Sequence, residues 1–154
     1  MIATDKTIIE ILNDLIKINN DRIAGYEKAA EEAKTVDIDL QGIFSKLAGE
    51  SKRHVKELKQ EVKKFGGDPA TGTTNFGKIY RIWTDVKTTF SGKDRHAMLE
   101  SFEHGEEATQ KSYSKALAFD DMNPDTRHLI ETQQAAMEIG HALIKRYRDI
   151  NKTS

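Results

Sequence analysis

The chain has 154 residues and no cysteine, which fits one domain of ordinary size and excludes disulfides, cysteine-ligated zinc and iron–sulfur clusters. Its 24 Lys and Arg residues balance 25 Asp and Glu residues, so no global positive field attracts the chain to nucleic-acid phosphates. The first residues lack the layout of a signal peptide, and no apolar run reaches the ~18 residues of a membrane span. We therefore expect a cytoplasmic protein with no nucleic-acid or membrane partner.

Apolar residues in the first half of the chain recur at steps of three and four, which is the spacing of one helix face. This pattern predicts a helix over residues 5–34 and a second helix over residues 39–65. The second helix should end at Gly66-Gly67, because glycine readily adopts the left-handed backbone that follows many helices. The short polar break between the two helices predicts an antiparallel hairpin.

A long connection follows, and it carries an apolar stripe from Phe76 to Phe90 that includes Trp83. The spacing of this stripe predicts a shorter helix over residues 76–90 that packs across the bundle as a crossover. The same aromatic surface could instead mediate homodimerisation, and the sequence leaves both interpretations open.

Two further long helices are predicted, over residues 93–119 and 124–149. Asn123 followed by Pro124 is typical of a helix start, because Asn caps free amide groups and Pro has no amide to leave unpaired. Two antiparallel hairpins joined by a long crossover have the connectivity of ferritin-like bundles. We therefore predict an all-α, ferritin-like four-helix bundle that occupies residues 1–154 as a single domain.

The last two predicted helices carry the residues that point to metal chemistry. Glu138 and His141 are spaced i, i+3, which places a carboxylate and an imidazole on one helix face. In two-metal carboxylate bundles, such a Glu-x-x-His pair supplies one carboxylate and one imidazole ligand. Glu103 and Glu106 share a stripe of the preceding helix, so both carboxylates can face inward.

Counting from the turns between helices places these groups at one depth of the bundle. At about 1.5 Å per residue, Glu106 and Glu138 lie within one or two turns of each other. Glu50 and His54 of the second helix, spaced i, i+4, fall at a similar level. The predicted metal ligands are Glu50, His54, Glu103, Glu106, Glu138 and His141.

The first helix breaks this pattern. It has only Asn19 and Asn20 at that level, and neutral amides are poor ligands for iron or manganese. Glu27 lies on the inward stripe but about 13 Å along the axis from the level of His54. The polar groups therefore predict either a partial polar layer or a working site for Fe or Mn. Carboxylates buried without metal would turn outward, pair with Lys or Arg, or take up protons.

Four stretches of the sequence are specific in combination: NDLIKINNDRIAGYEKAAEEAK, ELKQEVKKFGGDP, IYRIWTDVKTTFSGKD and LESFEHGEEATQKSYSKAL. They resemble a bacterial family of ferritin-like four-helix-bundle proteins that is described only as a domain of unknown function. The resemblance spans residues 5–149. It implies a ferritin-like fold and a bacterial source, and it implies no established activity.

The chain is more distantly similar to rubrerythrins and ferritins. Their sites use Glu on the first helix, Glu-x-x-His on the second, Glu on the third, and Glu or Glu-x-x-His on the fourth. Glu103 or Glu106, together with Glu138 and His141, match the second half of that pattern, whereas the first two helices depart from it.

Two functions follow from the sequence. The first is a non-enzymatic or binding bundle, stress-related, that has a partial polar site at mid-bundle and works as a homodimer or higher oligomer. The alternative is a di-iron or di-manganese carboxylate oxidase or ferroxidase, in which the six predicted ligands hold metals that activate O₂ or peroxide.

Overall fold

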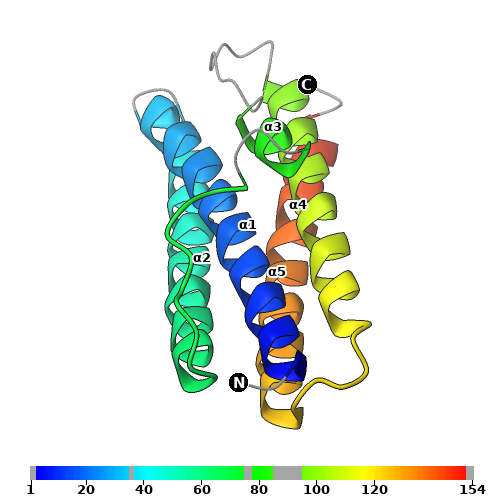
Figure 1. Ribbon diagram of the computed structural model, residues 1–154. Coiled ribbons are helices and arrows are strands. Elements are labelled where there is room, and N and C mark those ends of the chain that lie inside the picture. The colour runs from blue at the N-terminus through cyan, green and yellow to red at the C-terminus, as the bar shows by residue number, and fades with distance from the viewer. Residues whose placement is uncertain (1–2, 35–36, 75–77, 85–94, 152–154) are drawn as a thin grey trace.

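The computed structural model describes residues 3–34, 37–74, 78–84 and 95–151. These residues are almost all helical and contain no strand, and four long helices form two side-by-side pairs, α1 with α2 and α4 with α5 (Figure 1). The described helices are α1 (Ala3–Ala33), α2 (Ile38–Lys64), α3 (Lys78–Thr84), α4 (Arg95–Leu117) and α5 (Pro124–Asn151). The predicted helix over residues 76–90 is seen as α3, and its remaining residues lie outside the described ranges.

Two helix ends carry the capping chemistry that the sequence predicts. Gly66 adopts a left-handed φ of 81° just after α2, and the Gly67 amide donates to the Val62 carbonyl at 3.0 Å. Before α5, the Asn123 side-chain oxygen accepts a hydrogen bond of 2.9 Å from the Asp125 amide. Local sequence therefore determines where α2 ends and where α5 begins.

The apolar core consists of two clusters of buried side chains. One cluster contains Leu12 and Leu58, and the other contains Phe44 and Leu99. Between the two clusters, the inward positions of the long helices change from apolar to polar. This polar layer includes the buried residues Asn19, Arg22, Ser51, His54, Glu103, Glu106, Thr109 and Gln133.

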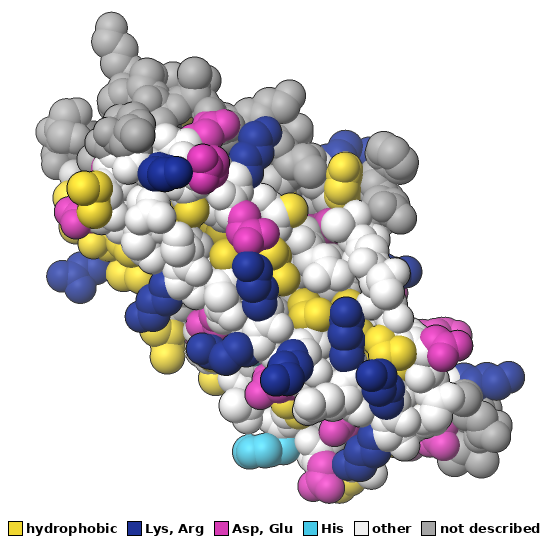
Figure 2. All heavy atoms as spheres, turned by 90° about the vertical axis from the view of Figure 1, so that its left-hand side faces the viewer, with side chains coloured by type: hydrophobic (Ala, Val, Ile, Leu, Met, Phe, Trp, Pro, Cys, Tyr) yellow, Lys and Arg dark blue, Asp and Glu magenta, His cyan; other side chains and the backbone are white. Residues whose placement is uncertain are grey.

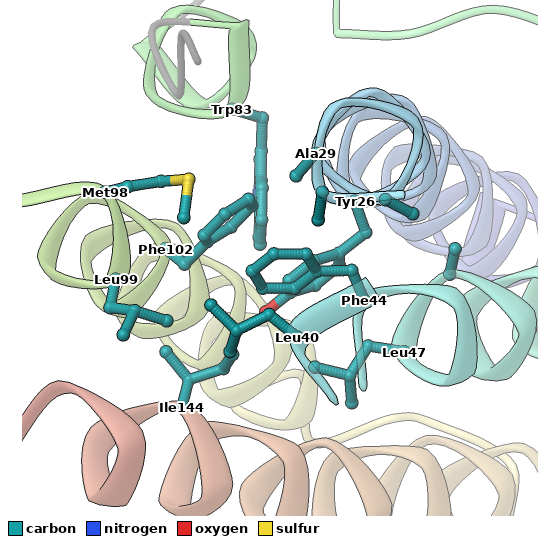
Figure 3. Close-up of a cluster of buried hydrophobic side chains, with 13 residues drawn as sticks. Tyr26, Ala29, Leu40, Phe44, Leu47, Trp83, Met98, Leu99, Phe102 and Ile144 are labelled. Atoms are coloured by element: carbon teal, nitrogen blue, oxygen red, sulfur yellow. The ribbon is translucent and has the colours of Figure 1, made fainter. Parts of the chain in front are cut away.

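The short helix α3 is anchored to the bundle by Trp83. Its buried indole points from α3 toward Tyr26 and Phe102, with ring centroids 5.2 Å and 6.1 Å away (Figure 3). Gly25 of α1 and Gly105 of α4 make room for the indole, because a Cβ at either position would lie within 2.9 Å of its atoms. Trp83 therefore belongs to the core of this chain, as the crossover interpretation predicts.

The outer side of the α1–α2 pair is charged. Figure 2 shows Lys and Arg side chains spread along this side, with Asp and Glu side chains between them. Glu27, which the sequence left as a remote possible ligand, pairs here with Lys52 at 2.7 Å, and both side chains are exposed. Exposed pairs of this kind contribute little stability. Among the described residues, no helix has the length and apolarity needed to cross a bilayer.

Candidate functional site

Arg22 of α1 lies fully buried in the middle of the polar layer. Its Nε and Nη2 atoms donate to the two carboxylate oxygens of Glu106 at 2.6 Å and 3.2 Å. Its Nη1 atom donates to Glu50 Oε1 at 3.0 Å and to Ser51 Oγ at 2.8 Å. The guanidinium therefore binds one carboxylate with two parallel bonds and joins α1 to both α2 and α4. We call Arg22, Glu50 and Glu106 the arginine cluster.

Arg22 keeps its positive charge despite burial. Burial alone would lower the pKa of Arg22, but Glu106, Tyr26 and Glu50 raise it above its ordinary value. The Tyr26 hydroxyl donates to Glu106 Oε1 at 3.0 Å. Burial, followed by the negative charge of Glu106, raises the pKa of Tyr26, so this hydroxyl stays protonated as a donor. The Glu106 carboxylate is thus fully engaged by protein donors.

A second hydrogen-bonded chain crosses the layer beside the arginine cluster. The Asn19 amide of α1 donates to the Tyr113 hydroxyl of α4 at 2.9 Å. That hydroxyl donates in turn to Gln133 Oε1 of α5 at 2.7 Å. Asn19, which the sequence places at the level of the predicted ligands, therefore connects helices through hydrogen bonds.

His54 lies in the same layer as a neutral imidazole. Burial, together with the charges of Arg22 and Arg53, lowers the pKa of His54 to about 4. Its Nδ1 atom is buried and has no hydrogen-bond partner among the described residues. A neutral imidazole can ligate a metal. Here, however, the positive charge of Arg22 that lowers the pKa of His54 would also repel a metal cation.

The Glu-x-x-His motif of α5 is rotated away from the bundle axis. Met137 and Gly140 are the buried pair at i, i+3 spacing, whereas Glu138 is exposed and the His141 side chain is 18% exposed. One residue along a helix corresponds to a turn of about 100°. A Cβ at Gly140 would lie 2.8 Å from a Leu47 methyl group and 3.2 Å from Arg22 Nη2. Gly140 therefore leaves room for the guanidinium.

A carboxylate–histidine group lies between α4 and α5. The group consists of Glu103, Glu107 and His141, and each residue offers one ligand atom. These three atoms lie within 4.8 Å of one another, close enough to bind a metal ion. The Glu103 side chain is 10% exposed, and one of its oxygens forms an ion pair with Arg148. Its other oxygen lies 4.0 Å from His141 Nε2. We call Glu103, Glu107 and His141 the flank group.

The structure thus divides the six predicted ligands among different surroundings. Glu50 and Glu106 meet at Arg22, whereas Glu103 and His141 meet in the flank group. His54 lies buried in the polar layer, and Glu138 lies at the surface.

Two residues of these sites, Arg22 and Glu107, are absent from the predicted set. Arg22 could have been found, because the inward spacing from Leu15 through Asn19 to Tyr26 passes through position 22. Glu107 lies four residues after Glu103, which is the spacing of neighbours on one helix face.

The side chains of the layer do not fit a two-metal centre as they are arranged here. The permanent positive charge of Arg22 lies among the carboxylate oxygens that metals would need, and like charges repel strongly in a buried site. The inward residues of α5 at this level are Met137 and Gly140, which supply neither carboxylate nor imidazole.

Comparison with known proteins agrees with the bundle architecture. No curated protein matches the chain. Among solved structures, the chain is similar to a bacterioferritin from Desulfovibrio desulfuricans that was studied for its diiron site, with 21% identity and a TM-score of 0.74. The match covers 96% of this chain and 80% of the other, and it confirms the predicted ferritin-like fold. A family described as a domain of unknown function (DUF2383) matches residues 7–119, and the chain therefore belongs to this family.

Proposed function

We propose that this protein is a non-enzymatic, ferritin-like binding bundle in which a buried guanidinium stands where a mid-bundle metal centre would lie. The four hydrogen bonds from Arg22 to Glu50, Ser51 and Glu106 carry this proposal. Buried carboxylates need a positive partner, and a bidentate guanidinium supplies one without a metal. The arginine cluster then serves to hold three helices in register around a polar layer.

The alternative function is a di-iron or di-manganese oxidase or ferroxidase. The diiron site of the similar bacterioferritin and the ligand types of the flank group favour some metal chemistry. This function would require Glu50 and Glu106 to leave Arg22 and bind metal instead. Both carboxylates would then exchange charge-assisted hydrogen bonds for metal bonds, and the buried Arg22 would keep Ser51 but lose both of its carboxylate partners.

Anaerobic titration with Fe(II), followed by exposure to O₂, separates the two functions. We expect E50Q to leave iron uptake unchanged, and we expect Fe(II) to oxidise no faster than in protein-free buffer. E50Q alters a partly exposed carboxylate, so the variant should fold. Uptake of two irons per chain, lost in E50Q and in H54A, would refute the proposal in favour of the oxidase.

We further propose that the protein is a cytoplasmic, stress-related bacterial protein that assembles as a homodimer. Two large apolar side chains of α5, Ile139 and Ile150, are exposed and lie about three helical turns apart, which places them on one face. These are the apolar side chains that a dimer contact through α5 would cover. Light scattering at tens of micromolar protein should give a dimer mass, and a monomer mass would reject the dimer.

A further inference from the structure

We propose that the flank group, Glu103, Glu107 and His141, binds one divalent transition-metal ion between α4 and α5. Two carboxylates and one imidazole are a ligand set suited to Mn²⁺, Fe²⁺, Co²⁺ or Zn²⁺. The site goes beyond the proposed function, because it uses none of the residues of the arginine cluster. The ion would leave that cluster intact.

The spacing of the ligand atoms suits a bridging ion. His141 Nε2 lies 4.0 Å from Glu103 Oε1, which is too long for a hydrogen bond. Two ligand atoms that each bind a metal at about 2.1 Å can be separated by up to roughly 4.2 Å. Glu107 is exposed, so its carboxylate is free to rotate toward the ion and complete the set of three ligands.

His141 provides an independent indication of a ligand. Its Nε2 atom is fully buried and has no hydrogen-bond partner among the described residues, although part of the ring is exposed. Buried polar atoms nearly always have a partner, and an orphaned imidazole nitrogen beside two carboxylates points to an ion. The exposed edge of the site leaves positions at which water can complete the coordination.

The surrounding charges also favour a cation. Arg148 pairs with one oxygen of Glu103, which leaves the other oxygen facing His141 and so orients the carboxylate for binding. Arg148 also pairs with Asp149, so its single positive charge is shared between two carboxylates. The flank group and these neighbours therefore keep a net negative charge, which favours a cation.

Titration of the full-length, chelator-treated protein with Co²⁺ tests the site, because bound Co²⁺ absorbs visible light. We expect one Co²⁺ per chain, displaced by Zn²⁺. The H141A and E107Q variants should each weaken binding by about tenfold or more. The matched controls are H128A, on exposed α5 surface, and E100Q, on exposed α4 surface, and both should bind as the wild type does.

The outcomes separate this inference from the proposed function. If Co²⁺ does not bind, or if H141A and E107Q bind it unchanged, the flank site is overturned while the arginine cluster stands. Because Glu107 is exposed, E107Q tests the site even if H141A does not fold. Two ions per chain, sensitive to E50Q and H54A, would instead contradict the proposed function.

Discussion

Replacing Arg22 with methionine should strongly destabilise the protein, because Glu106 would remain buried without its cation. Methionine keeps much of the apolar stem but removes all four hydrogen bonds of the guanidinium. Glu106 is 1% exposed and would keep only the Tyr26 hydroxyl as a side-chain donor, whereas Glu50 can turn toward water. Removing one partner of a buried ion pair lowers the free energy of unfolding by about 3–5 kcal/mol, which is a large part of a typical domain's stability.

A double-mutant cycle measured by urea unfolding tests whether this loss comes from the stranded charge. The R22M/E106Q variant removes both charges, so it should recover much of the stability lost in R22M. R22K should lose less than R22M, because lysine keeps the charge but cannot bind both oxygens of Glu106 in parallel. A cost below about 1 kcal/mol for R22M, or strictly additive effects in the double variant, would refute this account.

Three further predictions concern the packing at Gly140, the buried Trp83 and the protonation of His54. G140A should cost about 1–3 kcal/mol in urea unfolding, because its Cβ would lie 2.8 Å from a Leu47 methyl group. The matched change G42A, where a Cβ meets no described atom within 4 Å, should instead stabilise by up to about 1 kcal/mol; equal effects would contradict the packing argument. W83A should lower the free energy of unfolding by about 3–5 kcal/mol, and a small loss would show that the buried indole contributes little to the core. Burial and then neighbouring arginines lower the pKa of His54 from 6.5 to about 4, so protonation favours the unfolded chain. The stability present above pH 6.5 should therefore fall by up to ~3 kcal/mol as the pH drops toward 4. H54L should lack this loss of stability between pH 6.5 and pH 4. If the stability of H54L and of the wild type fell in parallel over this range, His54 would not be its cause.

Much of the fold could be predicted from the sequence because local and long-range signals agree. The 3–4 spacing of apolar residues locates the long helices, and the Gly66-Gly67 and Asn123-Pro124 pairs locate two of their ends. The mid-bundle level of Glu50 and Glu106 also follows from counting along helices of fixed rise. Pairing with Lys or Arg is also among the predicted ways to accommodate a buried carboxylate, and Glu106 pairs with Arg22.

The arrangement of the site could not be predicted because it depends on how each helix is rotated about its own axis. Met137 with Gly140 and Glu138 with His141 have the same i, i+3 spacing, and only a rotation of about 100° decides which pair faces inward. The spacing of Leu15, Asn19 and Tyr26 places Arg22 on the inward stripe of α1, but it does not identify the partner that a buried arginine needs. Its burial becomes favourable only once Glu106 arrives from a distant helix.

The arginine cluster has a consequence for the cooperativity of folding. Arg22 and Glu50 belong to the α1–α2 hairpin, whereas Glu106 belongs to the α4–α5 hairpin. Separating the hairpins would break both charge-assisted bonds between Arg22 and Glu106, and it would leave Glu106 without a cation while Arg22 keeps Glu50. Partly unfolded states with one intact hairpin are therefore penalised, and we expect the two hairpins to unfold together in a single transition.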